Sequence, residues 1–424
     1  MMRKSLALVS LSLGIAFINS IWSAVAQVSI PLPVPTNSQV QPPVQPKPRI
    51  PNIQPSRVLK PLNLGNNCTP RHACLGWDEQ LWNQIGKSGG GDRLALLASI
   101  DNSLSYLSRK SAIAAYQKYP VKGITHDRVR RSLIRFRELV VNSKSPEELQ
   151  AAVRREFTFY QSVGHDGQGT VKFTAYYEPI YNASRVRTEE YKYPLYRVPP
   201  DLAQWAKPHP KRVDLEGKDG LLGERSQLSG LEILWFRDRF DAYMVHIQGS
   251  AQIQLSDGTK TSIGFAGGTD YPWTSIGGQL SKDGKLAANQ LSMPGIINFF
   301  QSQPQEMNNY LPRWERFIFF KETAGRPATG SINVPVTAER SIATDKSLMP
   351  PGALALVHTS IPYPTSNGQM QYRTVSRFVL DQDTGSAIKG PGRVDYFMGS
   401  GKVAGDRAGV TGGKGSLYYL LLKR

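Results

Sequence analysis

The sequence predicts a mainly β protein with helices near its N-terminus, an α+β arrangement. Between residues 92 and 160, apolar residues such as Leu94, Leu97 and Ile100 recur at spacings of three and four, which is typical of amphipathic helices. From about Val171 onward, short apolar runs alternate with Gly, Pro, Asn and Asp, which indicates strands and turns. About 360 residues follow position 65, enough for two domains with cores of their own.

The N-terminal residues 1–26 have the pattern of a signal peptide. Arg3 and Lys4 precede an uncharged, mostly apolar run that closes with Ala24-Val25-Ala26. A retained membrane anchor is the alternative, but polar and small residues interrupt the run. We expect export to the periplasm or cell envelope, without a lipid anchor because no cysteine lies near the cleavage site. Residues 27–65 are rich in proline, which predicts an extended linker.

Charge and cysteine content limit the classes of partner and cofactor. Lys and Arg number 51 against 33 Asp and Glu, a formal charge of +18 that favours an anionic polymer or surface, although a solvated basic surface without a partner is the alternative. Because the chain is expected to be exported, nucleic acid is not the expected partner. Cys68 and Cys74, the two cysteines of the chain, predict a local disulfide. The scattered histidines and the lack of a nucleotide-binding motif predict no metal and no cofactor.

Local signals place individual elements along the chain. Ser145 can cap a helix that begins at Pro146, and Glu148 would complete a capping box. A helical interruption is expected at about 284–307. Strands are expected at residues 173–177, 242–247, 252–255, 316–320, 353–357, 372–380 and 417–422.

Three aspartates near the C-terminus are the candidates for chemistry. Asp345 precedes a Pro-Pro-Gly turn, Asp383 follows an apolar strand, and Asp395 lies inside the strand-like run 394–398. Glycines 385, 390 and 392 supply tight turns between the last two aspartates. Any single aspartate in such a context is often only a turn former or a helix cap, so a structural role remains open for each.

These aspartates resemble the trio of the 3D domain, and the resemblance extends to the MltA family. Phe173-Thr-Ala-Tyr-Tyr-Glu-Pro is similar to the family's FTGYY-x-P segment, with Ala175 in place of the usual glycine. The segment 243–251, which contains Gln248-Gly249-Ser250, resembles its VQGSG block, and Asp257-Gly258 and 275–277 follow in the family's order. The resemblance implies a double-psi β-barrel, formed with the helices by residues 66–178 and 319–424. It also implies an inserted β-rich domain at 179–318, with a groove between the two domains.

The same resemblance implies a lytic transglycosylase that cleaves the β-1,4 bond between N-acetylmuramic acid and N-acetylglucosamine in peptidoglycan, leaving 1,6-anhydro ends. Asp395 would be the catalytic acid and base, with Asp383 and Asp345 in support. The implied class is a lytic exotransglycosylase, although the sequence does not distinguish end from internal cleavage. We expect a monomer with peptidoglycan strands as partner and peripheral association with the wall or outer membrane. The substrate-binding positions would be Thr174, Tyr177, Gln248, Gly249, Ser250 and Lys389.

Two other functions remain open at this stage. Asp383-Thr-Gly matches the short signature of an aspartic protease, which needs a second such loop that this chain lacks. A non-catalytic wall-binding protein would keep the fold and the basic surface but would tolerate the loss of Asp395.

Overall fold

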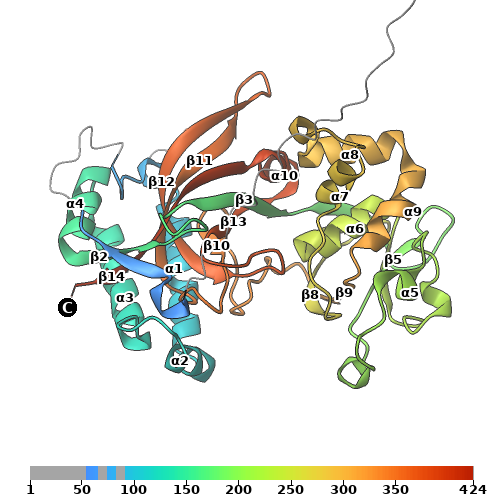
Figure 1. Ribbon diagram of the computed structural model, residues 1–424, viewed down its shortest axis with the longest axis horizontal. Coiled ribbons are helices and arrows are strands. Elements are labelled where there is room, and N and C mark those ends of the chain that lie inside the picture. Colours follow the sequence, from blue (N-terminus) through green and yellow to red (C-terminus); the bar gives the residue numbers. More distant parts are fainter. Residues whose placement is uncertain (1–53, 65–73, 83–90, 424) are drawn as a thin grey trace, which may run out of the picture. The chain divides into compact units, whose positions relative to one another are not determined.

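A computed structural model describes residues 54–64, 74–82 and 91–423 of the chain, and its strands form two sheets (Figure 1). The first sheet has eight strands in the order β1-β2-β14-β11-β12-β10-β13-β3. An additional pairing of β14 with β3 closes the last six of them into a barrel. The predicted fold class is confirmed. The strands are β1 (Leu59–Leu62), β2 (Phe157–Ser162), β3 (Val171–Glu178), β10 (Ser341–Ala343), β11 (Leu354–Pro364), β12 (Met370–Asp383), β13 (Arg393–Ser400) and β14 (Gly412–Leu422).

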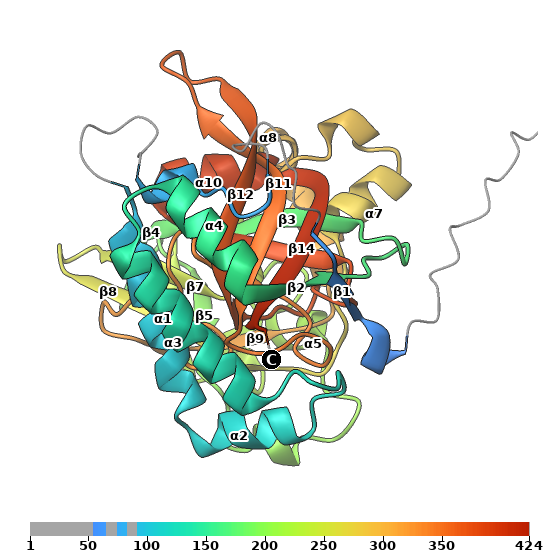
Figure 2. The same cartoon turned by 90° about the vertical axis from the view of Figure 1, so that its left-hand side faces the viewer.

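Four helices lie beside the barrel. They are α1 (Arg93–Leu107), α2 (Lys110–Gln117), α3 (His126–Asn142) and α4 (Pro146–Glu156). Helix α3 contacts β14, α4 contacts β2, α1 contacts β12 and α2 packs on α1 and α3, and Figure 2 shows α3 and α4 in front of β2 and β14. The Ser145 hydroxyl accepts the Glu148 N–H at 3.3 Å, as predicted. The Glu148 carboxylate takes the N–H of Lys144 rather than that of Ser145. The helical region ends at 156 instead of 160.

The barrel core combines inward strand residues with one stripe of each helix. Val129, Leu133, Phe136 and Val140 of α3 are all at most 1% exposed, as their spacing predicted. Phe136 lies against Phe378 of β12 with ring centroids 4.8 Å apart. This packing fixes the helices against the strands that carry the candidate aspartates.

The second sheet has the order β5-β6-β4-β7-β8-β9. It begins at β4, directly after β3 leaves the barrel, and its last strand in sequence is β9. Its strands are β4 (Ile180–Ser184), β5 (Tyr193–Tyr196), β6 (Glu232–Phe236), β7 (Ser250–Leu255), β8 (Lys260–Gly268) and β9 (Ile318–Glu322). Its helices are α5 (Arg212–Glu216), α6 (Arg239–Gln248), α7 (Ile276–Lys282), α8 (Met293–Ser302) and α9 (Met307–Tyr310), and α10 (Gly401–Val410) belongs to the barrel half.

Short 3-10 helices complete the described elements. They are η1 (Pro55–Arg57), η3 (Glu79–Leu81), η4 (Leu202–Gln204), η5 (Gly223–Arg225), η6 (Ala288–Gln290), η7 (Pro304–Glu306) and η8 (Leu311–Arg313).

The strand predicted at 242–247 is wrong, because these residues lie in α6. The Asp238 carboxylate caps this helix by accepting the N–H groups of Phe240 and Asp241, and Gly249 ends it with a φ of 80°. Residues 242–246 are all buried, so the run shows no amphipathic period. A short, fully buried apolar run does not distinguish a strand from a helix. The interruption predicted at 284–307 contains α8, while α7 precedes it.

The C-terminal part of the segment predicted as a linker contains a strand, because β1 pairs with β2 from Leu59↔Ser162 to Leu62↔Phe159. The predicted signal peptide 1–26 lies outside the described residues, as does most of 27–65. Cys74 is buried and disulfide-bonded, while its predicted partner Cys68 lies outside the described residues. Among the helices that the structure describes, none has the length and apolarity to cross a membrane.

Candidate active site

The register of five barrel strands places the candidate residues in one row. Ala343 of β10 is opposite both Asp383 and Asp395, Asp395 is opposite Thr174 of β3, and Thr174 is opposite Gly412 of β14. Directly opposed residues point their side chains to the same face of a sheet. The sequence separates Thr174 from Asp395 by 221 positions, and the barrel brings them side by side.

Asp395 points to the outer face of the barrel. Its strand neighbours Val394 and Tyr396 are at most 1% exposed and point into the core, whereas Asp395 is half-buried. The Thr174 hydroxyl donates to Oδ1 of Asp395 at 2.7 Å. Burial raises the pKa of Asp395 from its usual 3.8 to about 6, against the lowering effects of Thr174 and Arg393 and with a contribution from the Asp383 charge. A carboxyl group with this pKa can hold a proton in mildly acidic solution and release it.

Asp383 ends β12 and is held by three donors. The Tyr176 hydroxyl donates to Oδ2 at 2.8 Å, and the N–H groups of Ser331 and Thr384 donate to Oδ1 at 2.9 and 2.8 Å. Burial nevertheless raises its pKa above the usual value. Asp383 therefore has a fixed position and contributes negative charge near Asp395.

Tyr176 is a site residue that sequence reasoning did not assign. It lies two positions after Thr174, so on a strand both side chains share the outer face. The predicted Tyr177 points to the other face, where its ring lies against Gly405 of α10. Strand alternation from Thr174 was the signal that could have selected Tyr176.

Asp345 is buried and serves to hold loops together. Its carboxylate accepts the backbone N–H and the hydroxyl of Ser347, and also the N–H of Gly390 at 2.8 Å. Although burial alone would raise the pKa of Asp345, these hydrogen bonds hold it below the usual value. Gly390 has a φ of 80°, and the neighbouring Lys389 is exposed. Asp345 is thus an ionised carboxylate that accepts several hydrogen bonds, which suits it to positioning the 384–392 loop rather than to proton transfer.

The substrate-binding residues predicted at 248–250, which lead into the second sheet, lie close to β3. Oε1 of Gln248 accepts the N–H of Tyr177 at 3.2 Å, Gly249 forms the left-handed end of α6, and Ser250 begins β7. The structure therefore joins the Gln248-Gly249-Ser250 segment to the strand that carries Thr174.

Glu178 provides a second link between the two sheets. Its Oε2 accepts from the Ser400 hydroxyl at 2.8 Å and from the Gln252 side chain at 3.1 Å. Glu178 is 3% exposed, and burial raises its pKa above the usual value. Sequence reasoning quoted this glutamate within the Phe173–Pro179 motif without giving it a role.

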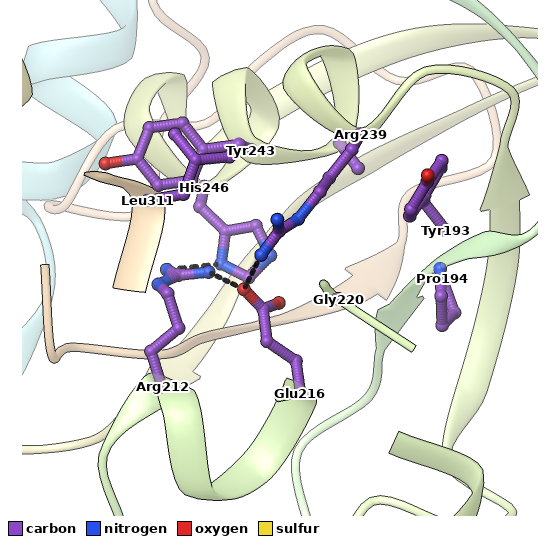
Figure 3. A pocket seen from close by; sticks show the side chains of 10 residues that line it. Tyr193, Pro194, Arg212, Glu216, Gly220, Arg239, Tyr243, His246 and Leu311 are labelled. Atoms are coloured by element: carbon purple, nitrogen blue, oxygen red, sulfur yellow. Dashed lines mark hydrogen bonds and ion pairs between the residues drawn. The ribbon is translucent and has the colours of Figure 1, made fainter. Parts of the chain in front are cut away.

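The half of the protein that contains the second sheet has a pocket with polar lining, which is too small for a sugar (Figure 3). Arg212, Glu216, Arg239 and His246 point toward one another there, and the cavity of about 10 Å³ accommodates about one water molecule. The Arg212 guanidinium lies over aromatic rings, 5.0 Å from Trp314. We interpret this pocket as the polar part of the insert core.

The arrangement on the barrel supports proton transfer by one carboxyl group. Within the described residues no hydrogen bond joins Asp383 to Asp395, and Ala343 of β10 stands between them in the register. The shared-proton pair that an aspartic protease requires is therefore not formed by these two aspartates. In the described part of the chain, no three His, Cys, Asp or Glu side chains are grouped so as to hold a metal ion.

Comparison with known proteins agrees with this geometry. Residues 172–321 match the model of the MltA specific insert domain, and residues 340–421 match that of the 3D domain. Membrane-bound lytic murein transglycosylase A of Escherichia coli K12 is 30% identical over 263 residues, which is 62% of this chain and 68% of the relative. The homologue from Buchnera aphidicola is 31% identical over 279 residues, 65% of this chain and 73% of the relative.

Solved structures show the same fold. The crystal structure of a membrane-bound lytic murein transglycosylase from Agrobacterium tumefaciens matches with a TM-score of 0.61 and 27% identity, over 78% of this chain and 93% of that one. E. coli MltA with bound chitohexaose matches with a TM-score of 0.63 and 23% identity, over 82% and 96%. The sequence and fold matches together show that this chain belongs to the MltA family.

Proposed function

We propose that this chain is a lytic transglycosylase of peptidoglycan that cleaves between N-acetylmuramic acid and N-acetylglucosamine and leaves 1,6-anhydro ends. Its family and the names of its relatives in E. coli and Buchnera support this function. The observation that carries the proposal is Asp395, a half-buried carboxyl group with a raised pKa on the outer face of the barrel, held by one hydroxyl donor.

Asp395 acts first as an acid. In its protonated form it donates to the glycosidic oxygen while positive charge develops at C1 of the muramic acid residue. Burial keeps the proton on Asp395 until the bond breaks, and the nearby Asp383 charge adds to this effect. Asp383 itself, held by Tyr176 and two backbone N–H groups, provides negative charge that favours the developing cation.

Asp395 then acts as a base. Its carboxylate removes the proton from the C6 hydroxyl of the same sugar, and the C6 oxygen attacks C1 to close the 1,6-anhydro ring. The C1 bond to the leaving oxygen breaks, the new C1–O6 bond forms, and no water is consumed. Nucleophile and electrophile belong to one sugar, so proximity accelerates the second step. Thr174 orients Asp395 in both steps through its 2.7 Å hydrogen bond.

The glycan occupies a groove that starts at Thr174 and Asp395 and continues along the Gln248-Gly249-Ser250 segment. The 3.2 Å bond between Tyr177 and Gln248 supports this path, since it brings the two segments together. We assign residues 66–178 and 319–424 to the helices and barrel and 179–318 to the insert. The end of β3 at Glu178 fits the first boundary, whereas β9 (Ile318–Glu322) pairs with β8 of the second sheet, which extends the insert to Glu322.

The same function implies a place in the cell envelope. Relatives named as membrane-bound support envelope association, and the pattern of residues 1–26 supports export. We propose a periplasmic enzyme that associates peripherally with the wall or outer membrane, acts as a monomer and needs no cofactor.

The test is mass spectrometry of sugars released from intact peptidoglycan by the wild type and by Asp395→Asn. The wild type should release 1,6-anhydromuramyl products, one water lighter than hydrolytic products. Asn cannot donate or accept the proton, so the variant should lose about 10²–10⁴-fold in rate. Ordinary reducing ends would indicate a hydrolase instead. Binding of peptidoglycan without release of sugars by the wild type would indicate a non-catalytic wall-binding protein.

A further inference from the structure

Three cations lie side by side on the barrel next to the candidate active site. Arg393 of β13 is directly opposite Lys172 of β3, and Lys172 is directly opposite Lys414 of β14. We call Arg393, Lys172 and Lys414 the basic row. It crosses the same three strands as the row formed by Asp395, Thr174 and Gly412, two residues farther along each strand.

The basic row shares the outer face of the barrel with Asp395. Residues two apart on a strand point to the same side, and the hydrogen bond between Thr174 and Asp395 identifies that side. The exposure pattern agrees, since Phe173 and Val394, which lie between the two rows, are buried while Lys172 and Lys414 are exposed. Two residues span about 7 Å along a strand, so the cations are about one sugar away from the reacting carboxyl.

The cations of this row have no acidic partners within the described residues. None of the three forms an ion pair with a carboxylate there, and Nε of Arg393 is buried without a hydrogen-bond partner. Like charges directly opposite each other destabilise a sheet. Some surface cations of this protein are paired, as in Arg131 with Asp127 and Lys402 with Asp406, whereas others, such as Lys118, form no ion pair within the described residues. The position of the row beside Asp395 therefore distinguishes it from other unpaired surface cations. An unpaired row that costs stability beside a reactive carboxyl indicates a binding role.

We propose that the basic row binds the carboxylates of the peptide stem carried by the muramic acid residue at the cleaved bond. This inference rests on the proposed function. The glycan backbone of peptidoglycan is uncharged where the lactyl group is joined to a peptide, so the negative charges beside the scissile bond are the carboxylates of that peptide. Arg393 offers a planar fork for one carboxylate, while the two lysines provide point charges along the stem. The enzyme therefore prefers peptide-bearing glycan over peptide-free glycan.

The experiment compares kcat/KM on two substrates, peptidoglycan with intact stems and glycan strands stripped of stems by an amidase. Lys172→Gln/Lys414→Gln should lower the preference for the peptide-bearing substrate by about three- to tenfold, the size expected for two exposed charge interactions. Arg393→Gln is measured separately, because Arg393 also lowers the pKa of Asp395. The matched control replaces the exposed Lys110, Lys118 and Lys122, which lie in or near α2, with glutamine.

The control variant should keep the substrate preference of the wild type. Equal loss on both substrates would overturn the proposal, because it would show a general attraction to the wall instead of recognition of the stem. An unchanged preference in the double variant would overturn it as well. If the wild type cleaves neither substrate, the proposed function fails. The basic row is then tested by binding alone, and it survives only if the double variant loses affinity for peptide-bearing strands selectively.

Discussion

Two kinds of buried carboxylate occur in the barrel half, those that form an ion pair with a cation and those that do not. Asp78 inside the barrel half is almost fully buried, and it accepts from Arg340 at 2.5 Å and from Arg377 at 3.1 Å. Although burial opposes its charge, these two guanidinium groups hold the pKa of Asp78 below its usual value. Asp395 on the outer face has a hydroxyl partner instead, and its pKa rises to about 6.

The difference separates structural carboxylates from reactive ones. Asp381, which a register shift places opposite Ile342 instead of Ala343, is fully buried and pairs with Lys346, Thr344 and Tyr419. Like Asp78, it has a cation beside it, which compensates the buried charge. Within the described residues no cation forms an ion pair with the Asp395 carboxylate, so protonation rather than pairing offsets its burial. Burial thus favours proton transfer only where the cation is missing.

The largest effect is expected on stability, from Asp78→Asn. This change leaves two fully buried guanidinium groups without their shared carboxylate, although Arg340 keeps its pair with Asp92. Removing one partner of a buried ion pair costs about 3–5 kcal/mol. Thermal and urea unfolding should show this loss, with transglycosylase activity per folded molecule unchanged. Asp127→Asn removes an exposed pair with Arg131 and should cost less than about 1 kcal/mol. Equal stability of the two variants would contradict the comparison.

A smaller effect of opposite sign is expected for the stability of Asp395→Asn. The folded pKa of about 6 exceeds the usual 3.8, so protonation of Asp395 stabilises the fold below about pH 4 and this contribution disappears as the pH rises through 6. At pH 7.5 the variant should therefore be more stable than the wild type by about 1–2 kcal/mol, and at pH 4 it should be similar.

Asp345→Asn is the matched comparison for that experiment. The pKa of Asp345 is lowered, so its carboxylate stabilises the fold above its unfolded pKa, and this contribution is lost as the pH falls. Its asparagine variant should be less stable than the wild type at pH 7.5. If both variants change stability in the same direction at this pH, the distinction between the two aspartates is incorrect.

Sequence reasoning identified Asp395 and Thr174 as neighbours in one site only through a family resemblance. Asp395 and Thr174 lie 221 positions apart, and no local pattern states that β13 and β3 are neighbours. The resemblance supplied both residues, and the structure adds the hydrogen bond between them. Strand alternation from the predicted Thr174 would have selected Tyr176 instead of Tyr177. The basic row could not be found in this way, since its members come from three strands far apart in sequence.

Helices were predictable from the sequence where only one of their faces is buried. The stripe of α3 and the Ser145 cap of α4 followed from local spacing, because one side of each helix faces water. The same spacing rule gave the wrong result for α6, whose residues 242–246 are buried on every side. Local patterns therefore specify amphipathic elements, while pairings and fully buried segments depend on contacts that the sequence does not display.

The smallest effect is expected when the donor to Asp395 is removed. Thr174→Val keeps the shape of the side chain but loses the hydroxyl, which lowers the pKa of Asp395 by donating to its charged form. Activity that needs protonated Asp395 falls as the pH rises through about 6 in the wild type. In the variant this fall should move upward by about one pH unit, the size of one hydrogen bond to a charged group.

The pH dependence of kcat/KM measures this shift, with Thr174→Ser as the variant that should restore the wild-type profile. Thr158→Val on β2 is a control for the loss of a threonine hydroxyl from a strand outside the closed barrel. If the serine and valine variants were equally impaired, packing of the methyl group rather than donation by the hydroxyl would set the position of Asp395. A valine profile equal to that of the wild type would mean that burial alone determines its pKa, with no contribution from the residue opposite it on β3.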